Sequence, residues 1–151
     1  MNSGTYNLIE KFINNLTNES YPDMLYHFTN EETLLQILKS NTLLGADVNN
    51  HQVSFTSDET YASSGFQPQE RVTSVLVFDA NKLSRDYDIK RFIYGETKRD
   101  KEDYINEHEW VIENKVNNII DYLLFIGDNG ISSLQLENIN KLFPNINIEK
   151  W

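Results

Sequence analysis

The chain carries three short segments whose polar side chains could surround one ligand. The first segment supplies the imidazole of His27. The second supplies the hydroxyls of Ser54 and Thr56, and the third supplies the carboxylates of Glu107 and Glu109. An acid, an imidazole and a hydroxyl around one cleft can hold a polar molecule and stabilise charge that develops on it. The order of the three segments indicates a binding or catalytic site.

His27 lies in a short apolar run that precedes a helical pattern, so we expect it in a strand that leads into a helix. A strand fixes the direction of a side chain, which suits a ring that must keep one orientation. The alternative is a partly buried histidine that only hydrogen-bonds to the backbone.

Ser54 and Thr56 should face the same side of a strand because strand side chains alternate. If that side faces inward, the two hydroxyls need partners, and a ligand could provide them. The alternative is a solvent-facing polar stripe with Val53 and Phe55 buried opposite. Tyr61, in a loop farther on, could stack on a flat ligand or simply cover the core.

Glu107 and Glu109 share one face of an extended segment, with Trp110 on the other. Two carboxylates so close together suggest a functional site if they are buried and mean little if they are exposed. We expect no metal site in the chain, because His51 and His108 lack partners at ligand spacing. The sequence also lacks cysteine and the glycine-rich motifs of dinucleotide and phosphate loops.

The hydrophobic pattern predicts one α+β domain over residues 1–151. It predicts three longer helices. The first lies at about 5–18, and the second follows a capping box of Thr29 and Glu32 and ends near Asn41. The third lies at 132–142, with Ser132 or Ser133 as its cap. Asp79 should cap a single helical turn through Leu83. Strands are predicted around His27 and at 43–44, 51–56, 73–78, 88–94, 110–112, 120–126 and 146–148.

Composition limits the partners of the chain. Of its 151 residues 39% are hydrophobic, which supports a folded core, and the formal net charge is −10. This charge disfavours nucleic acid, since phosphates would be repelled. No run is apolar for long enough to span a membrane, and the N-terminus lacks the features of a secretory signal. We therefore expect a cytoplasmic protein without a membrane partner.

The ordered motifs Tyr26-His27-Phe28-Thr29, Ser54-Phe55-Thr56-Ser57 and Glu107-His108-Glu109 resemble those of the ADP-ribosyltransferase superfamily. The chain looks most similar to small phage and bacterial members that have a Tyr-His-x-Thr first strand and a Glu-x-Glu third motif. The resemblance covers about residues 25–126. It implies a split β-sandwich with flanking helices and a cleft that binds NAD as a substrate.

The resemblance also implies roles for individual residues. His27 would hydrogen-bond the NAD ribose, with Thr29 as a neighbouring polar contact. Ser54 would support the cleft beside Thr56, and Tyr61 would stack on nicotinamide. Glu109 would be the catalytic carboxylate, and Glu107 its partner in choosing the acceptor. The chain departs from many relatives at Phe28, where they have glycine, which changes how nicotinamide meets the backbone.

The function implied is transfer of ADP-ribose from NAD to a macromolecular acceptor, most simply a protein, by a phage or bacterial effector. NAD hydrolysis is expected where no acceptor is present. If a phage encodes the chain, it would act in the host cytoplasm. The alternative is an inactive protein of the same fold, for example an acidic inhibitor of a host defence system. Transfer to nucleic acid would require a locally basic cleft.

Overall fold

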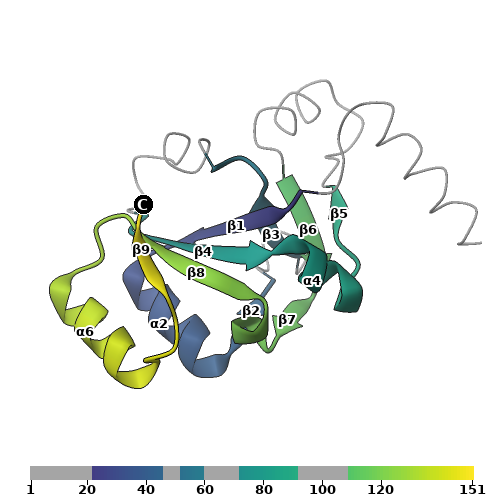
Figure 1. Cartoon of the computed structure of the whole chain (residues 1–151). Coiled ribbons are helices and arrows are strands. Elements are labelled where there is room, and N and C mark those ends of the chain that lie inside the picture. Colours follow the sequence, from purple (N-terminus) through teal and green to yellow (C-terminus); the bar gives the residue numbers. More distant parts are fainter. Residues whose placement is uncertain (1–21, 46–51, 60–71, 92–108) are drawn as a thin grey trace, which may run out of the picture.

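The computed structural model describes residues 22–45, 52–59, 72–91 and 109–151 (Figure 1). Within these ranges the chain is α+β, with a mixed seven-stranded sheet, a two-stranded ribbon and three α-helices. The predicted helix at about 5–18 lies outside the described residues, as do Tyr61 and Glu107.

The large sheet has the strand order β5-β6-β3-β1-β4-β8-β9. Its neighbouring strands are antiparallel except for β8 and β9, which run parallel. Among the described strands, β5 and β9 form its two edges. The strand predicted at 73–78 is confirmed as β4, which lies inside the sheet and pairs with β1 on one side and β8 on the other. The bounds are β1 Met24–Thr29, β3 Gln52–Thr56, β4 Ser74–Asp79, β5 Lys90–Arg91, β6 Glu109–Glu113, β8 Leu123–Asp128 and β9 Ile148–Lys150.

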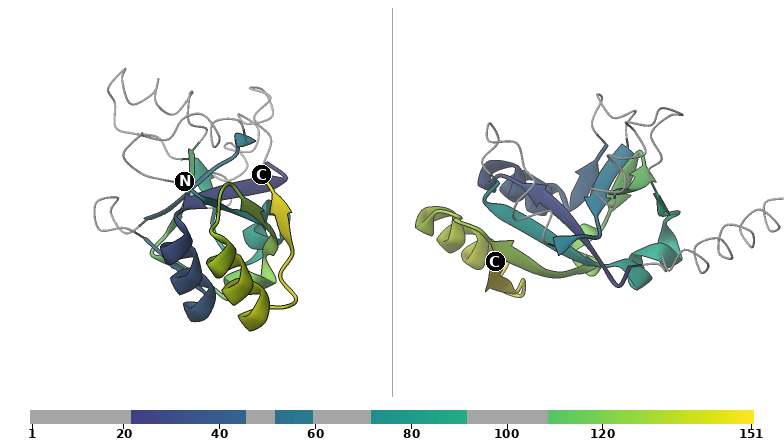
Figure 2. Two further views of the ribbon diagram at one scale, coloured as in Figure 1. Left: turned by 90° about the vertical axis from the view of Figure 1, so that its left-hand side faces the viewer. Right: turned by 90° about the horizontal axis from the view of Figure 1, so that it is seen from above.

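The sheet opens between β1 and β3. These strands pair at one position only, Tyr26 with Thr56. By contrast, β1 follows β4 along its whole length, from Met24 to Thr29, and β3 follows β6 in the same way. Seen from above in Figure 2, the pair formed by β3 and β6 turns away from β1, which is drawn in purple. The opening lies beside His27 of β1 and Ser54 of β3.

The helix α2 (Glu31–Ser40) begins one residue later than the capping box predicted. Asn30 is the N-cap and accepts a hydrogen bond from the backbone N–H of Thr33 at 2.8 Å. Thr29 remains in β1, where it pairs with Ser74. The prediction that Thr29 caps the helix was therefore wrong. Pairing with β4 keeps Thr29 in the strand, and the next residue, Asn30, takes the cap position.

The other two α-helices have the predicted caps. Asp79 accepts from the backbone of Lys82 at the start of α4 (Ala80–Asp86), and Ser132 accepts from Gln135 at the start of α6 (Ser133–Leu142). The predicted strand at 120–126 was wrong at its start. Residues Ile119–Asp121 form a 3-10 helix after Asn118, whose φ of 54° breaks the extended chain.

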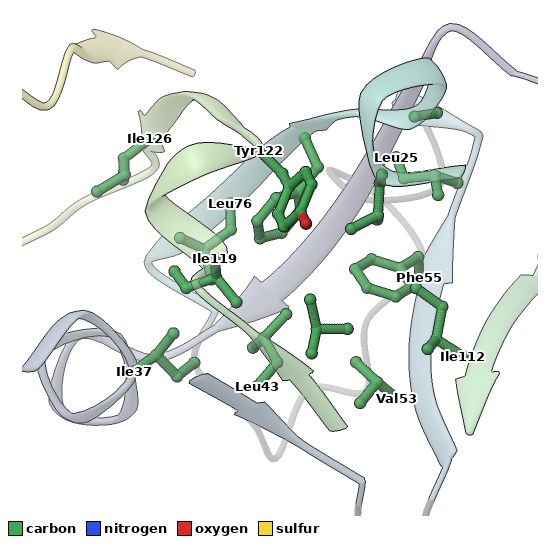
Figure 3. Close-up of a cluster of buried hydrophobic side chains, with 14 of the residues drawn as sticks. Leu25, Ile37, Leu43, Val53, Phe55, Leu76, Ile112, Ile119, Tyr122 and Ile126 are labelled. Atoms are coloured by element: carbon green, nitrogen blue, oxygen red, sulfur yellow. The ribbon is translucent and has the colours of Figure 1, made fainter. Parts of the chain in front are cut away.

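One face of the sheet covers the main hydrophobic core. Strands β2 (Thr42–Leu44) and β7 (Lys115–Asn117) form the ribbon that closes this core, with Leu43 and Val116 paired at its centre. Figure 3 shows the side chains of several strands directed into the same interior. The labelled core residues are Leu25, Ile37, Leu43, Val53, Phe55, Leu76, Ile112, Ile119, Tyr122 and Ile126.

The opposite face of the sheet carries a smaller aromatic cluster. Trp151 packs there, with its ring centroid 5.6 Å from that of Tyr26 and 6.4 Å from that of Phe125. Gly127 provides the space for the indole, because a Cβ at this position would lie 2.7 Å from Trp151 Cε3 and 3.2 Å from Val75 Cβ. The glycine is therefore required by a close side-chain approach.

We expect Gly127→Ala to lower the free energy of unfolding by about 1–3 kcal/mol, the usual cost of inserting a methyl group into a packed site. Urea unfolding of the variant and the parent measures this loss. The same substitution in a Trp151→Ala background should cost much less, because the indole is gone. Equal losses in both backgrounds would show that the indole does not set the requirement for glycine.

Candidate functional site

Ser54 connects two of the predicted site residues. Its hydroxyl donates a short hydrogen bond to Glu109 Oε1, and its backbone carbonyl lies 2.8 Å from His27 Nδ1. Since β3 lies between β1 and β6, one residue of β3 can reach both neighbours. The structure therefore brings His27, Ser54 and Glu109 together, although they are far apart in sequence.

The register of β3 and β6 places Glu109 on the hydroxyl side of β3. Thr56 pairs directly with Glu109, so their side chains and that of Ser54 share one face. Val53 and Phe55 are buried in the core on the opposite face. The alternation predicted for β3 is confirmed. The face is not simply solvated, however, because Glu109 is only 8% exposed and Thr56 only 7%.

His27 approaches Ser54 from the core face of β1. Its partly buried ring packs edge-on against Phe55, with centroids 5.9 Å apart. Because a carbonyl oxygen only accepts, Nδ1 must carry the proton and donate to Ser54 O. Burial lowers the pKa of His27 below its ordinary value of 6.5, and the hydrogen bond to the Ser54 backbone opposes that shift. The ring is therefore neutral at pH 7 and keeps Nε2 as an acceptor.

The other predicted residues of β1 divide between the two faces. Thr29 lies on the face of His27 and is buried beside the paired strand β4. Phe28 lies on the face of Ser54 and Glu109, where it packs against the aromatic cluster around Tyr26. Thr29 and Phe28 thus flank the opening of the sheet from opposite sides.

The end of β3 is held by contacts that the sequence patterns did not reveal. Thr56 Oγ1 accepts from the backbone N–H of Asp58 at 3.1 Å, and the Trp110 indole N–H donates to Ser57 Oγ at 3.2 Å. Serine and threonine commonly form such local turns, so the Thr56 contact had a recognisable signal. The Trp110 contact had none, because it depends on pairing between distant strands.

The arrangement can stabilise positive charge on a bound molecule. A carboxylate shielded from water interacts more strongly with a nearby cation than an exposed one does. The Ser54 hydroxyl fixes the orientation of this carboxylate before any ligand arrives. Within the described ranges, no group of three or more acidic or histidine side chains is placed to hold a metal ion.

A cavity of about 420 Å³ lies elsewhere, between α6 and the edge of the sheet. None of the predicted site residues lines it. The residues that line the cavity are Asp128, Leu136, Asn140, Ile146, Asn147, Ile148, Glu149 and Lys150.

No helix in the described ranges is both long and apolar enough to cross a membrane.

A scan against protein-family models and a search of curated proteins found no match to this sequence.

The lowered pKa of His27 predicts a loss of stability at acidic pH. Below pH 6.5 the unfolded chain binds a proton at His27 that the folded protein does not bind, so unfolding becomes more favourable as pH falls toward the folded pKa. Urea unfolding at pH 7.5 and 5.5 should show a larger drop for the parent than for His27→Gln. The difference can reach about 1.4 kcal/mol for each pH unit below the unfolded pKa. The two other histidines are common to both proteins, so identical pH dependence would contradict the assignment.

Proposed function

We propose that this protein is an NAD-dependent mono-ADP-ribosyltransferase, and that its opened sheet is a split β-sandwich of that superfamily. The observation that carries the proposal is the double link at Ser54. It joins the imidazole of His27 to the buried carboxylate of Glu109. The resemblance of the three motifs assigns ribose binding to the first of these groups and catalysis to the second.

The reaction requires stabilisation of a sugar cation. The bond between the nicotinamide nitrogen and ribose C1′ breaks, and its electron pair goes to the nicotinamide, which leaves neutral. Positive charge then develops on the ribose, as it does in glycoside hydrolysis. Glu109 would stabilise that charge. A nucleophile of the acceptor forms the new bond to C1′ and releases its proton to solvent, and water in that role gives hydrolysis.

His27 suits the binding of ribose. Its neutral ring uses Nδ1 for the Ser54 backbone, which leaves Nε2 to accept a hydrogen bond from a ribose hydroxyl. The packing against Phe55 restricts the ring orientation. His27 lies on the core face of the sheet and Glu109 on the opposite face, so a dinucleotide that contacts both groups would have to reach them through the opening between β1 and β3.

The second candidate is a non-catalytic protein that binds a basic partner. The net charge of −10 favours it, because an acidic surface attracts a basic one. This candidate needs no NAD, so a thermal-shift titration separates the two. A ligand that binds the native state raises the unfolding temperature, and no shift at millimolar NAD would favour the binding protein.

We expect Glu109→Gln to fold and bind NAD but to lose about a hundredfold or more in the rate of nicotinamide release, because the amide cannot stabilise the sugar cation as a carboxylate does. Circular dichroism and calorimetric NAD titration check folding and binding. The matched control is Glu113→Gln, an exposed residue of the same strand, which should keep the parental rate. Undiminished turnover in Glu109→Gln would refute the catalytic assignment.

A further inference from the structure

Gln52 carries a buried oxygen that lacks a hydrogen-bond partner. Among the buried side-chain oxygens and nitrogens of the part of the chain that the structure describes, Gln52 Oε1 alone has no hydrogen-bond partner. A carbonyl-type oxygen removed from water without a donor destabilises the folded protein, so such groups are rare in native structures. An unpaired polar group next to a candidate site suggests that a ligand supplies the missing partner.

The position of Gln52 connects it to the site. It begins β3, two residues before Ser54, so the two side chains share one strand face. The residue between them, Val53, is buried in the core on the other face. Gln52 pairs with Glu113 at the far end of β6 from Glu109. The Gln52 side chain therefore extends the polar row of Ser54 and Thr56 along β3, beyond the single position where β1 and β3 pair.

We propose that Gln52 is a positioning residue that hydrogen-bonds the carboxamide of the nicotinamide ring; this inference rests on the proposed function. Two residues of an antiparallel strand advance by roughly 7 Å. A group that bonds Gln52 therefore lies a short way along the ligand from the atoms held by Ser54 and Glu109. In NAD, the nicotinamide carboxamide is likewise a short distance along the molecule from the glycosidic bond.

The chemistry of the carboxamide also matches. It has an N–H₂ that can donate to the Gln52 oxygen and a carbonyl that can accept from the Gln52 amide nitrogen. Two amides can therefore pair with two parallel hydrogen bonds. The bond would hold the leaving group in place while Glu109 acts on the sugar. ADP-ribose, which lacks nicotinamide, would not use Gln52.

The first arm of the test is the ligand-free protein. We compare Gln52→Met with Gln36→Met, the same substitution at an exposed site on α2. Methionine has a similar length but removes the unpaired amide oxygen, so Gln52→Met should unfold at the parental temperature or above it. A marked fall in the unfolding temperature, not seen in Gln36→Met, would show that Gln52 has a structural partner and would overturn the proposal.

The second arm is calorimetric titration with NAD and with ADP-ribose. Gln52→Met should bind NAD about tenfold more weakly than the parent and ADP-ribose within twofold of the parent, as expected from loss of a hydrogen bond to nicotinamide. Unchanged NAD affinity, or equal weakening for both ligands, would overturn the role of Gln52 alone. A parent protein that binds neither ligand would overturn the proposed function and this inference with it.

Discussion

The candidate site depends on the two hydrogen bonds made by Ser54. One uses its backbone and reaches β1, and the other uses its hydroxyl and reaches β6. Both require β3 to lie between those strands, and the first also requires β1 to have left the ladder, because a continued ladder would occupy the backbone carbonyl. The opening of the sheet and the assembly of the site are therefore parts of the same structural arrangement.

Burial on one face of β3 supports order on the other. Val53 and Phe55 are packed in the main core, which fixes the backbone from which Ser54 projects. Phe55 also contacts the ring of His27, so a single core residue restrains both the strand and the imidazole. A functional group is held most accurately when the element that carries it is rigid. Placing the site on paired strands rather than on a loop meets that condition.

Local features were predictable from the sequence, whereas relations between distant strands were not. The alternation in β3 and the caps Asp79 and Ser132 follow from neighbouring residues alone. The cap of α2 was misassigned because Thr29 and Asn30 are both good caps, and only pairing with β4 distinguishes them. Likewise, the sequence suggested a serine near a glutamate. It could not show that His27 bonds the backbone of that serine from the other face, because this depends on where β1 and β3 separate.

The two edges of the large sheet have a consequence for behaviour at high concentration. At one edge the described part of β5 consists of Lys90 and Arg91, and at the other β9 ends with the exposed charged residues Glu149 and Lys150. Unpaired strand edges invite pairing with another molecule, and short, charged edges discourage it. Two copies that met at their β9 edges would gain few backbone hydrogen bonds and would have to desolvate ionic side chains. At the β9 edge, these charges therefore oppose growth of the sheet into larger β-aggregates.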